Sequence, residues 1–276
     1  MAEFNSHLLL ATGTMAVWDV LCSGICRHKS DEECLTRTHL VFPYRGVYVH
    51  HTGQAETVAE ANQVVFFNEG EPYRVSHPVE GGDASLSIGT DEQTLLELLP
   101  ADVLHTKNRT LLNRPRMRID ARTQLLAALV RHRLTCGVIE TLEAEDLILS
   151  LVSRALGKRT SYAASGSVGR QKLADRAKLV LSSSLGRRWT LAEIGSAVGV
   201  SPVYLTQVFR QVEGLPLYRY QLQLRLARAL DLLNDCADLT GLALDLGFSS
   251  YSHFSTTFKQ AYGLTPLAFQ RSSRLS

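Results

Sequence analysis

Four side chains that bind soft metal ions lie within 13 residues of one another near the start of the chain. They are Cys22, Cys26, His28 and Cys34. Structural zinc sites use thiolate and imidazole ligands, but they usually take cysteines in tight pairs with two residues between them. Neither cysteine pair here has that spacing. We therefore expect no metal cofactor, and a metal- or redox-sensing cluster is the less favoured interpretation of this stretch.

Patterns of residues that would indicate an enzyme are missing from the sequence. A cupin enzyme binds metal through a His-x-His strand, whereas His50 and His51 are adjacent and would point to opposite faces of an extended strand. The sequence contains no nucleophile elbow, phosphate loop or dinucleotide fingerprint. We therefore expect that the chain has no catalytic residues and is not an enzyme.

Residues 190–212 have the pattern of two short helices joined by a turn. Thr190 and Glu193 have the spacing of a capping box, in which each residue satisfies an amide of the other at a helix start. Gly199 interrupts the helical pattern, and Ser201 followed by Pro202 predicts a second helix start. The second helix would extend from Pro202 to about Val212.

The same pattern recurs in residues 238–262. Asp238 predicts one helix start, Gly247 the turn and Ser249 the start of a second helix. Between the two patterns, residues 218–234 have the apolar spacing of one longer helix. A single pair of short helices is weak support for DNA binding, but two pairs joined by a long helix are much more specific.

Residues 172–272 resemble the DNA-binding domain of the AraC/XylS family of bacterial transcriptional regulators. The resemblance rests on LAEIGSAVGVSPVYLTQVF at 191–209, on LALDLGFSSYSHFSTTFKQAYGLTPLAF at 242–269, and on Arg225, Ala229 and Leu232-Leu233 between them. It implies a sequence-specific regulator that binds duplex DNA, works as a homodimer and contacts RNA polymerase.

The resemblance also implies which side chains meet DNA, because each second helix would lie in the major groove. The side chains that would face bases are Val203, Thr206, Gln207, Tyr251, Ser252, Ser255 and Thr256. The side chains that would contact phosphate are Ser201, Arg210, Arg225, Ser249 and Lys259. Of the first set, Gln207 is able to form two hydrogen bonds with an adenine edge.

The charge of the chain is divided unevenly along its length. The whole chain of 276 residues has a net charge of +2. Residues 170–276 hold 13 Lys and Arg against 7 Asp and Glu, a net charge of +6, and residues 1–169 have a net charge of −4. A basic half attached to an acidic half is typical of a DNA-binding domain with a sensor or oligomerisation domain.

The N-terminal half has short runs typical of strands, at Met15–Leu21, His39–Phe42, Gly46–His50 and Gln63–Asn68. Strands at this spacing favour a barrel or a double-sheet jelly roll. With the family resemblance, we expect an α+β chain. Its N-terminal domain would be a cupin-like β-barrel with appended helices, and its C-terminal domain would be all-α, with two helix-turn-helix units joined by a long helix.

Three helices are expected after the strands, at Asp91–Leu99, Arg122–Arg133 and Glu140–Leu156. The last two either pack on their own barrel or form the contact of the expected homodimer. Residues 158–171 are rich in Gly, Ser and Ala and predict a linker. The expected domains are therefore 1–157 for effector binding or dimerisation and 172–276 for DNA binding.

The cysteines and the hydropathy indicate the compartment. Five scattered cysteines, no secretory leader and no apolar run of about 20 residues indicate a cytoplasmic protein with reduced thiols and no membrane partner. The sequence does not identify the effector or the operator. It also does not show whether the protein activates or represses transcription. The alternative function is a cupin-type metal-dependent enzyme, or a metal or redox sensor, with an accessory helical domain.

Overall fold

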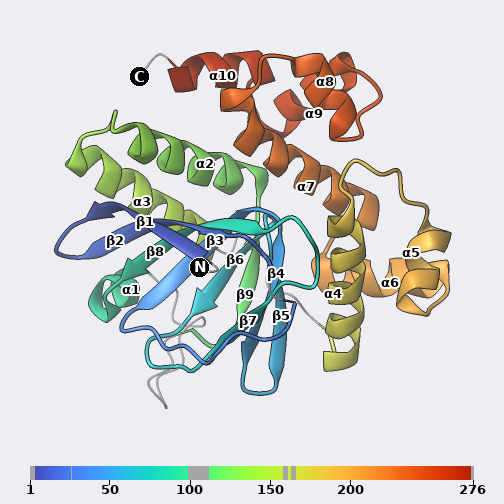
Figure 1. Cartoon of the computed structure of the whole chain (residues 1–276), viewed down its shortest axis with the longest axis horizontal. Helices are drawn as coiled ribbons and strands as arrows, with labels where there is room; N and C mark the ends of the chain where they lie inside the picture. The colour runs from blue at the N-terminus through green and yellow to red at the C-terminus, as the bar shows by residue number, and fades with distance from the viewer. Residues whose placement is uncertain (1–3, 26, 99–111, 158–160, 163–165, 275–276) are drawn as a thin grey trace. The chain divides into compact units, whose positions relative to one another are not determined.

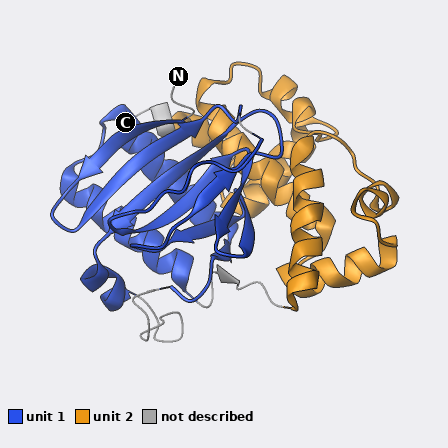
Figure 2. Cartoon of the chain, turned by 60° about the horizontal axis from the view of Figure 1, so that its bottom comes forward, with its two compact units in different colours: residues 1–163 blue, residues 164–276 orange. Residues whose placement is uncertain are grey.

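The computed structural model describes residues 4–25, 27–98, 112–157, 161–162 and 166–274, which fold as two compact units. Unit 1 comprises residues 1–163 and unit 2 residues 164–276, shown in two colours in Figure 2. The division falls inside the predicted linker, residues 158–171. Regular structure extends further into that stretch than we predicted, since Ser161–Tyr162 forms strand β10 and Val168 begins helix α4.

Unit 1 contains two antiparallel sheets (Figure 1). The larger sheet has the strand order β1-β2-β8-β3-β6-β9-β10, and the smaller sheet has the order β5-β4-β7. The strands of these sheets before β10 are β1 Phe4–Ala11, β2 Met15–Cys22, β3 Thr38–Arg45, β4 Val47–Thr52, β5 Ala55–Glu60, β6 Gln63–Phe67, β7 Arg74–Ser76, β8 Asp83–Thr90 and β9 Arg116–Ile119.

The α+β class is confirmed, but the closed barrel that we predicted is wrong. Closure requires the strands at the edges to pair with one another. Among the residues that the structure describes, no ladder of paired strands joins the two sheets. The edge strand β1 is exposed along most of its length, and within the described part of the chain it pairs with β2 alone. The strands therefore make a double-sheet arrangement.

The four predicted strands match β2, β3, β4 and β6, but strand β8 in the centre of the larger sheet was missed. Every residue of β8 is buried, although its sequence alternates Leu86 and Ile88 with Ser85 and Ser87. The two apolar side chains belong to the main core, and the serines lie on the opposite, also buried, face. The hydroxyl of Ser87 lies 2.8 Å from His39 Nδ1. A central strand with small polar residues on one face lacks the composition that predicts a strand.

The main core of unit 1 lies between the larger sheet and two helices. Helix α2 spans Ala121–Cys136 and helix α3 spans Thr141–Leu156, and both lie beside the sheet in Figure 1. A shorter helix, α1, spans Glu92–Leu98. Ile148, Leu151 and Val152 of α3 are buried against the sheet. A large part of the apolar face of α3 is thus used within its own unit.

All the regular elements that the structure describes in unit 2 are helical. Its elements are α4 Val168–Ser183, α5 Leu191–Val198, α6 Pro202–Glu213, α7 Leu217–Leu232, the 3-10 turn Leu233–Asp235, α8 Leu239–Asp245, α9 Tyr251–Tyr262 and α10 Pro266–Arg274. The predicted helices at 190–212 and 238–262 and the long helix between them are confirmed. The last of these ends at Leu232, two residues before the predicted end, and continues as the 3-10 turn.

A fully buried ion pair attaches α4 to α6. Lys178 Nζ lies 2.6 Å from Glu213 Oε1 and 3.2 Å from Asp175 Oδ1. The side chains of Lys178 and Glu213 are 0% and 1% exposed. Charges removed from water so completely are tolerated only when they are paired. This contact therefore constrains where α6 packs on α4.

We expect Lys178→Met to lower the unfolding free energy of unit 2 by about 3–5 kcal/mol, because Glu213 would remain buried without its cation. Urea unfolding of the full chain followed by circular dichroism measures the change. Lys172→Met is the matched control on the same helix, since Lys172 is exposed, and its effect should stay within about 0.5 kcal/mol. Equal losses in the two variants would contradict a structural role for the buried pair.

Candidate nucleic-acid interface

Local hydrogen bonds set the start of α5, the first helix of the first pair. The Thr190 hydroxyl accepts from the Glu193 amide at 3.2 Å, and the Thr190 amide donates to the Glu193 carboxylate at 2.7 Å. The predicted capping box is confirmed. Hydrogen bonds from Thr190, together with the guanidinium of Arg187, lower the pKa of Glu193 to about 2. The carboxylate therefore stays ionised in acid solution at a pH where an ordinary glutamate would take up a proton.

The second helix of the first pair, α6, buries one face and exposes the other. Ser201 accepts a hydrogen bond from the Tyr204 amide at 3.2 Å, which confirms the predicted start. Leu205 and Phe209 are fully buried, whereas Val203 is 68% exposed. Four predicted DNA contacts of this helix and its cap lie on the exposed or half-buried side: Ser201, Thr206, Gln207 and Arg210. The Thr206 hydroxyl donates to the carbonyl of Pro202 at 2.8 Å.

The second pair begins as predicted but its second helix starts one residue later. Asp238 accepts hydrogen bonds from the amides of Thr240 and Gly241 at 3.0 and 2.9 Å. The residue that begins α9 is Ser250, which accepts from the His253 amide at 3.1 Å. Our assignment of this cap to Ser249 is wrong. The Ser249 hydroxyl instead lies 3.1 Å from His253 Nδ1, on the exposed side of the turn.

Helix α9 has the same division into two faces as α6. Phe254 and Phe258 are fully buried and pack against each other with ring centres 5.6 Å apart. Of the predicted base-reading residues of α9, Ser252 and Thr256 are exposed. Tyr251 and Ser255 are half-buried. Lys259 is exposed one turn further along the helix. Each second helix thus presents a row of exposed or half-buried side chains, most of them polar, followed by one basic residue.

Two exposed residues at the helix starts were missed by the sequence reasoning. Tyr204 is 47% exposed in the first turn of α6, and His253 is exposed in the first turn of α9. Their positions in the sequence could have identified them, because both lie three residues after the serine that caps the helix.

Arg225 differs from the other predicted phosphate contacts because it is buried. It is 9% exposed, and its guanidinium donates to the carbonyls of Leu185, Arg187 and Gly247 at 2.7, 2.9 and 3.0 Å. Burial lowers the pKa of Arg225. Its position therefore gives no support to a phosphate contact and indicates that it holds the two helix pairs together.

The potential metal ligands that lie together in the structure differ from the four residues that are close in the sequence. Cys26 lies outside the described residues, and His28 and Cys34 are exposed. Among the residues that the structure describes, the potential metal ligands brought together are Cys22, His77 and Asp83. Hydrogen bonds with Asp83 and Cys22 raise the pKa of His77 to about 10.

Comparison with known proteins identifies the C-terminal unit. The helix-turn-helix domain family matches residues 194–272. The chain is 33% identical over 106 residues to the HTH-type transcriptional activator RhaR of Klebsiella pneumoniae, a match that covers 38% of each chain. The C-terminal unit is an AraC-type helix-turn-helix domain. The resemblance predicted from residues 191–209 and 242–269 is thereby confirmed.

Two further relatives match different lengths of the chain. One matches the AraC-type domain, and the other matches most of the chain. A crystal structure of a transcriptional regulator of the AraC type from Chromobacterium violaceum is 30% identical and covers 39% of this chain and 96% of its own, with a TM-score of 0.37. The probable transcriptional regulator LumQ of Photobacterium leiognathi is 25% identical over 241 residues, covering 85% of this chain and 92% of that protein. The chain spans only 38% of the length of RhaR.

None of the described helices is both long enough and apolar enough to cross a lipid bilayer.

If Arg225 joins the two halves of the AraC-type domain, Arg225→Gln should lower the unfolding free energy of unit 2 by at least about 3 kcal/mol. One hydrogen bond that involves a charged group contributes about 1.5–3 kcal/mol, and Arg225 makes three. Arg210→Gln provides the matched control, because Arg210 is exposed on α6 and its loss should change stability by no more than about 0.5 kcal/mol. Chemical denaturation of both variants measures this. A stable Arg225→Gln protein that has merely lost DNA affinity would favour the phosphate role instead.

Proposed function

We propose that this chain is a sequence-specific DNA-binding regulator of transcription in the cytoplasm, with α6 and α9 as its two DNA-reading helices. The observation that carries the proposal is the matched pair of second helices. Each starts at a serine cap, buries several aromatic or aliphatic side chains, and exposes mostly polar ones. The net charge of +6 from residue 170 onward adds the attraction to phosphate that duplex binding needs.

On α6, Gln207 is the side chain suited to reading a base. It is exposed, and its amide both donates and accepts, which matches the N6 and N7 atoms of adenine. Such a pair is worth about 1–3 kcal/mol of discrimination. Val203 and Thr206 lie beside it and offer apolar contact to a thymine methyl group.

On α9, the predicted base-reading residues are short. Ser252, Ser255 and Thr256 pair with several bases and so discriminate less than Gln207. Tyr251 completes the group at the start of the helix. We propose that α6 contributes more sequence information than α9, and that α9 contributes more through its fit to the groove.

Phosphate contacts position the two helices without reading sequence. Arg210 and Lys259 are exposed near the last turns of α6 and α9. Ser201 and Ser249 are exposed at the beginnings of the same helices, where backbone amides favour an anion. We propose these four residues as phosphate contacts and leave Arg225 out of the set.

The deciding experiment is selection of binding sites from random duplex DNA with the full chain and two variants. Gln207→Ala should change the preferred base at one or two positions. Lys259→Ala should weaken binding to all sequences alike and reduce the slope of log affinity against log salt by about 1. The two variants control for each other, since both residues are exposed. An unchanged motif for Gln207→Ala together with an altered one for Lys259→Ala would reverse the two roles.

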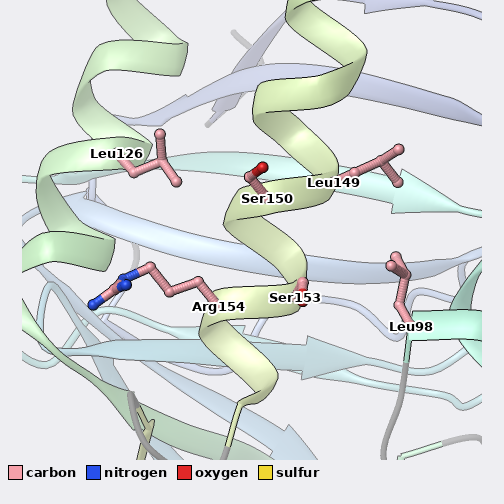
Figure 3. Close-up of a pocket in the computed structure, with 6 residues that line it drawn as sticks. All are labelled: Leu98, Leu126, Leu149, Ser150, Ser153 and Arg154. Atoms are coloured by element: carbon pink, nitrogen blue, oxygen red, sulfur yellow. The ribbon is translucent and has the colours of Figure 1, made fainter.

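We also propose that the chain forms a homodimer through α2 and α3. Leu142, at the start of α3, is 79% exposed. Further along, an open groove of about 590 Å³ is lined by Leu98, Leu126, Leu149, Ser150, Ser153 and Arg154 (Figure 3). Its three leucines come from α1, α2 and α3. Two linked DNA-binding domains would raise avidity by about 10²–10⁴ where the linker geometry allows it.

The proposed dimer predicts that Leu142→Arg yields a folded monomer, because exposed Leu142 contributes little to the core of its own unit. Leu151→Asp is unsuitable for this test, since Leu151 is fully buried in the core of unit 1. Sedimentation equilibrium of both the parent and the variant measures the change. Glu145→Arg, a change in charge of the same helix at a half-buried acidic residue, tests whether added charge alone has the effect. A parent chain that is already monomeric would refute the proposal.

The proposed function also includes a signal received by unit 1, from a small molecule or another source, and contact with RNA polymerase. These two elements rest on the resemblance of the C-terminal unit to AraC-type regulators. Regulation in response to a signal would require differential interaction of that signal with two states of unit 1. The binding-site selection described above does not depend on either element.

A further inference from the structure

Three potential metal ligands meet at one end of the two sheets of unit 1. Cys22 is the last residue of β2 and Asp83 is the first of β8, and the two are direct partners across the antiparallel pair. His77 follows β7, which belongs to the smaller sheet. One ligand atom from each residue lies within 4.8 Å of the other two. His77 Nε2 is 2.9 Å from Asp83 Oδ2.

The surroundings of the three residues hold them in place. His77 and Asp83 have side chains that are 7% and 9% exposed, and Cys22 is half-buried. Gly82, with a φ of +69°, lies so close to β2 that a Cβ there would be 2.4 Å from the carbonyl oxygen of Cys22. Only glycine permits this approach. The backbone segments that carry Cys22 and Asp83 are therefore fixed before any ion binds, so binding would order few groups.

The set of donor atoms determines which ions suit the site. A thiolate is a soft ligand that magnesium and calcium do not use, whereas zinc is bound by thiolate, imidazole and carboxylate together. Cysteine and aspartate supply two negative charges, which match a divalent ion. Three protein ligands leave a fourth tetrahedral position open to water or to a further ligand.

We propose that Cys22, His77 and Asp83 bind one divalent transition-metal ion of the zinc class, with the fourth position open. The site differs from the group of Cys22, Cys26, His28 and Cys34 that the sequence spacing suggested. It shares only Cys22 with that group. The proposal goes beyond transcriptional regulation and does not depend on it, because all three ligands belong to unit 1 and the DNA-reading helices to unit 2.

The test is titration of the reduced, chelator-treated full chain with cobalt(II), which replaces zinc and is visible by absorption. We expect one equivalent to bind, with the d–d bands of a tetrahedral ion and a charge-transfer band from the thiolate, and zinc should displace it. Cys22→Ser should abolish the charge-transfer band. Asp83→Asn and His77→Gln should each weaken cobalt binding by at least about tenfold. Loss of a residue that only hydrogen-bonds to a metal ligand already weakens metal binding by about that factor.

Cys34→Ser and His28→Gln are the matched controls, because both residues are exposed and belong to the alternative cluster. Both variants should bind cobalt as the parent does. Circular dichroism identifies any variant that fails to fold. Cys22→Ser is the deciding variant, because it exchanges a single sulfur atom for oxygen. An absent thiolate band in the parent would overturn the proposal. A band that survives in Cys22→Ser and is lost in Cys34→Ser would overturn it in favour of the alternative cluster.

Discussion

The guanidinium of Arg225 is the contact on which the arrangement of the AraC-type domain depends. It lies on α7, the helix between the two pairs, and donates to carbonyls on both sides. Leu185 and Arg187 precede α5, and Gly247 lies in the turn between α8 and α9. Hydrogen bonds from an ionised donor are roughly twice as strong as neutral ones. One buried side chain thus links α7 to the segment before α5 and to the turn before α9.

Close packing around this arginine requires glycine in the second turn. Gly247 has a φ of +80°, and a Cβ at that position would be 2.3 Å from the carbonyl oxygen of Gly186 and 2.8 Å from the Arg225 guanidinium. The buried pair of Lys178 and Glu213 is a second polar contact between helices, and it attaches α6 to α4. Both polar contacts are buried, whereas Gln207 on α6 and Lys259 on α9 are exposed. The polar contacts that hold the helices together therefore use other residues than the exposed faces of α6 and α9.

The helix boundaries were predictable where the interactions that set them are local. Thr190 with Glu193, Ser201, and Asp238 each satisfy backbone amides within a few residues of themselves. Their residue types therefore contain most of the information needed. Ser249 and Ser250 mark the limit of this reasoning, because both are good caps and the choice between them depends on how the turn packs. The exposed polar faces of α6 and α9 followed from the helical period in the same way.

The sequence by itself determined the helix pairs of the C-terminal unit, the α+β class and the uneven charge, because these depend on local hydrogen bonding, on periodicity and on composition. Only the tertiary structure decided that the strands form two sheets, that β8 is a central strand despite its serines, and that Arg225 is buried. It also decided that Cys22 meets His77 and Asp83 rather than its neighbours along the chain. The physical reason is that these features result from contacts between distant segments, and spacing along the chain does not record which strand ends pair across a sheet.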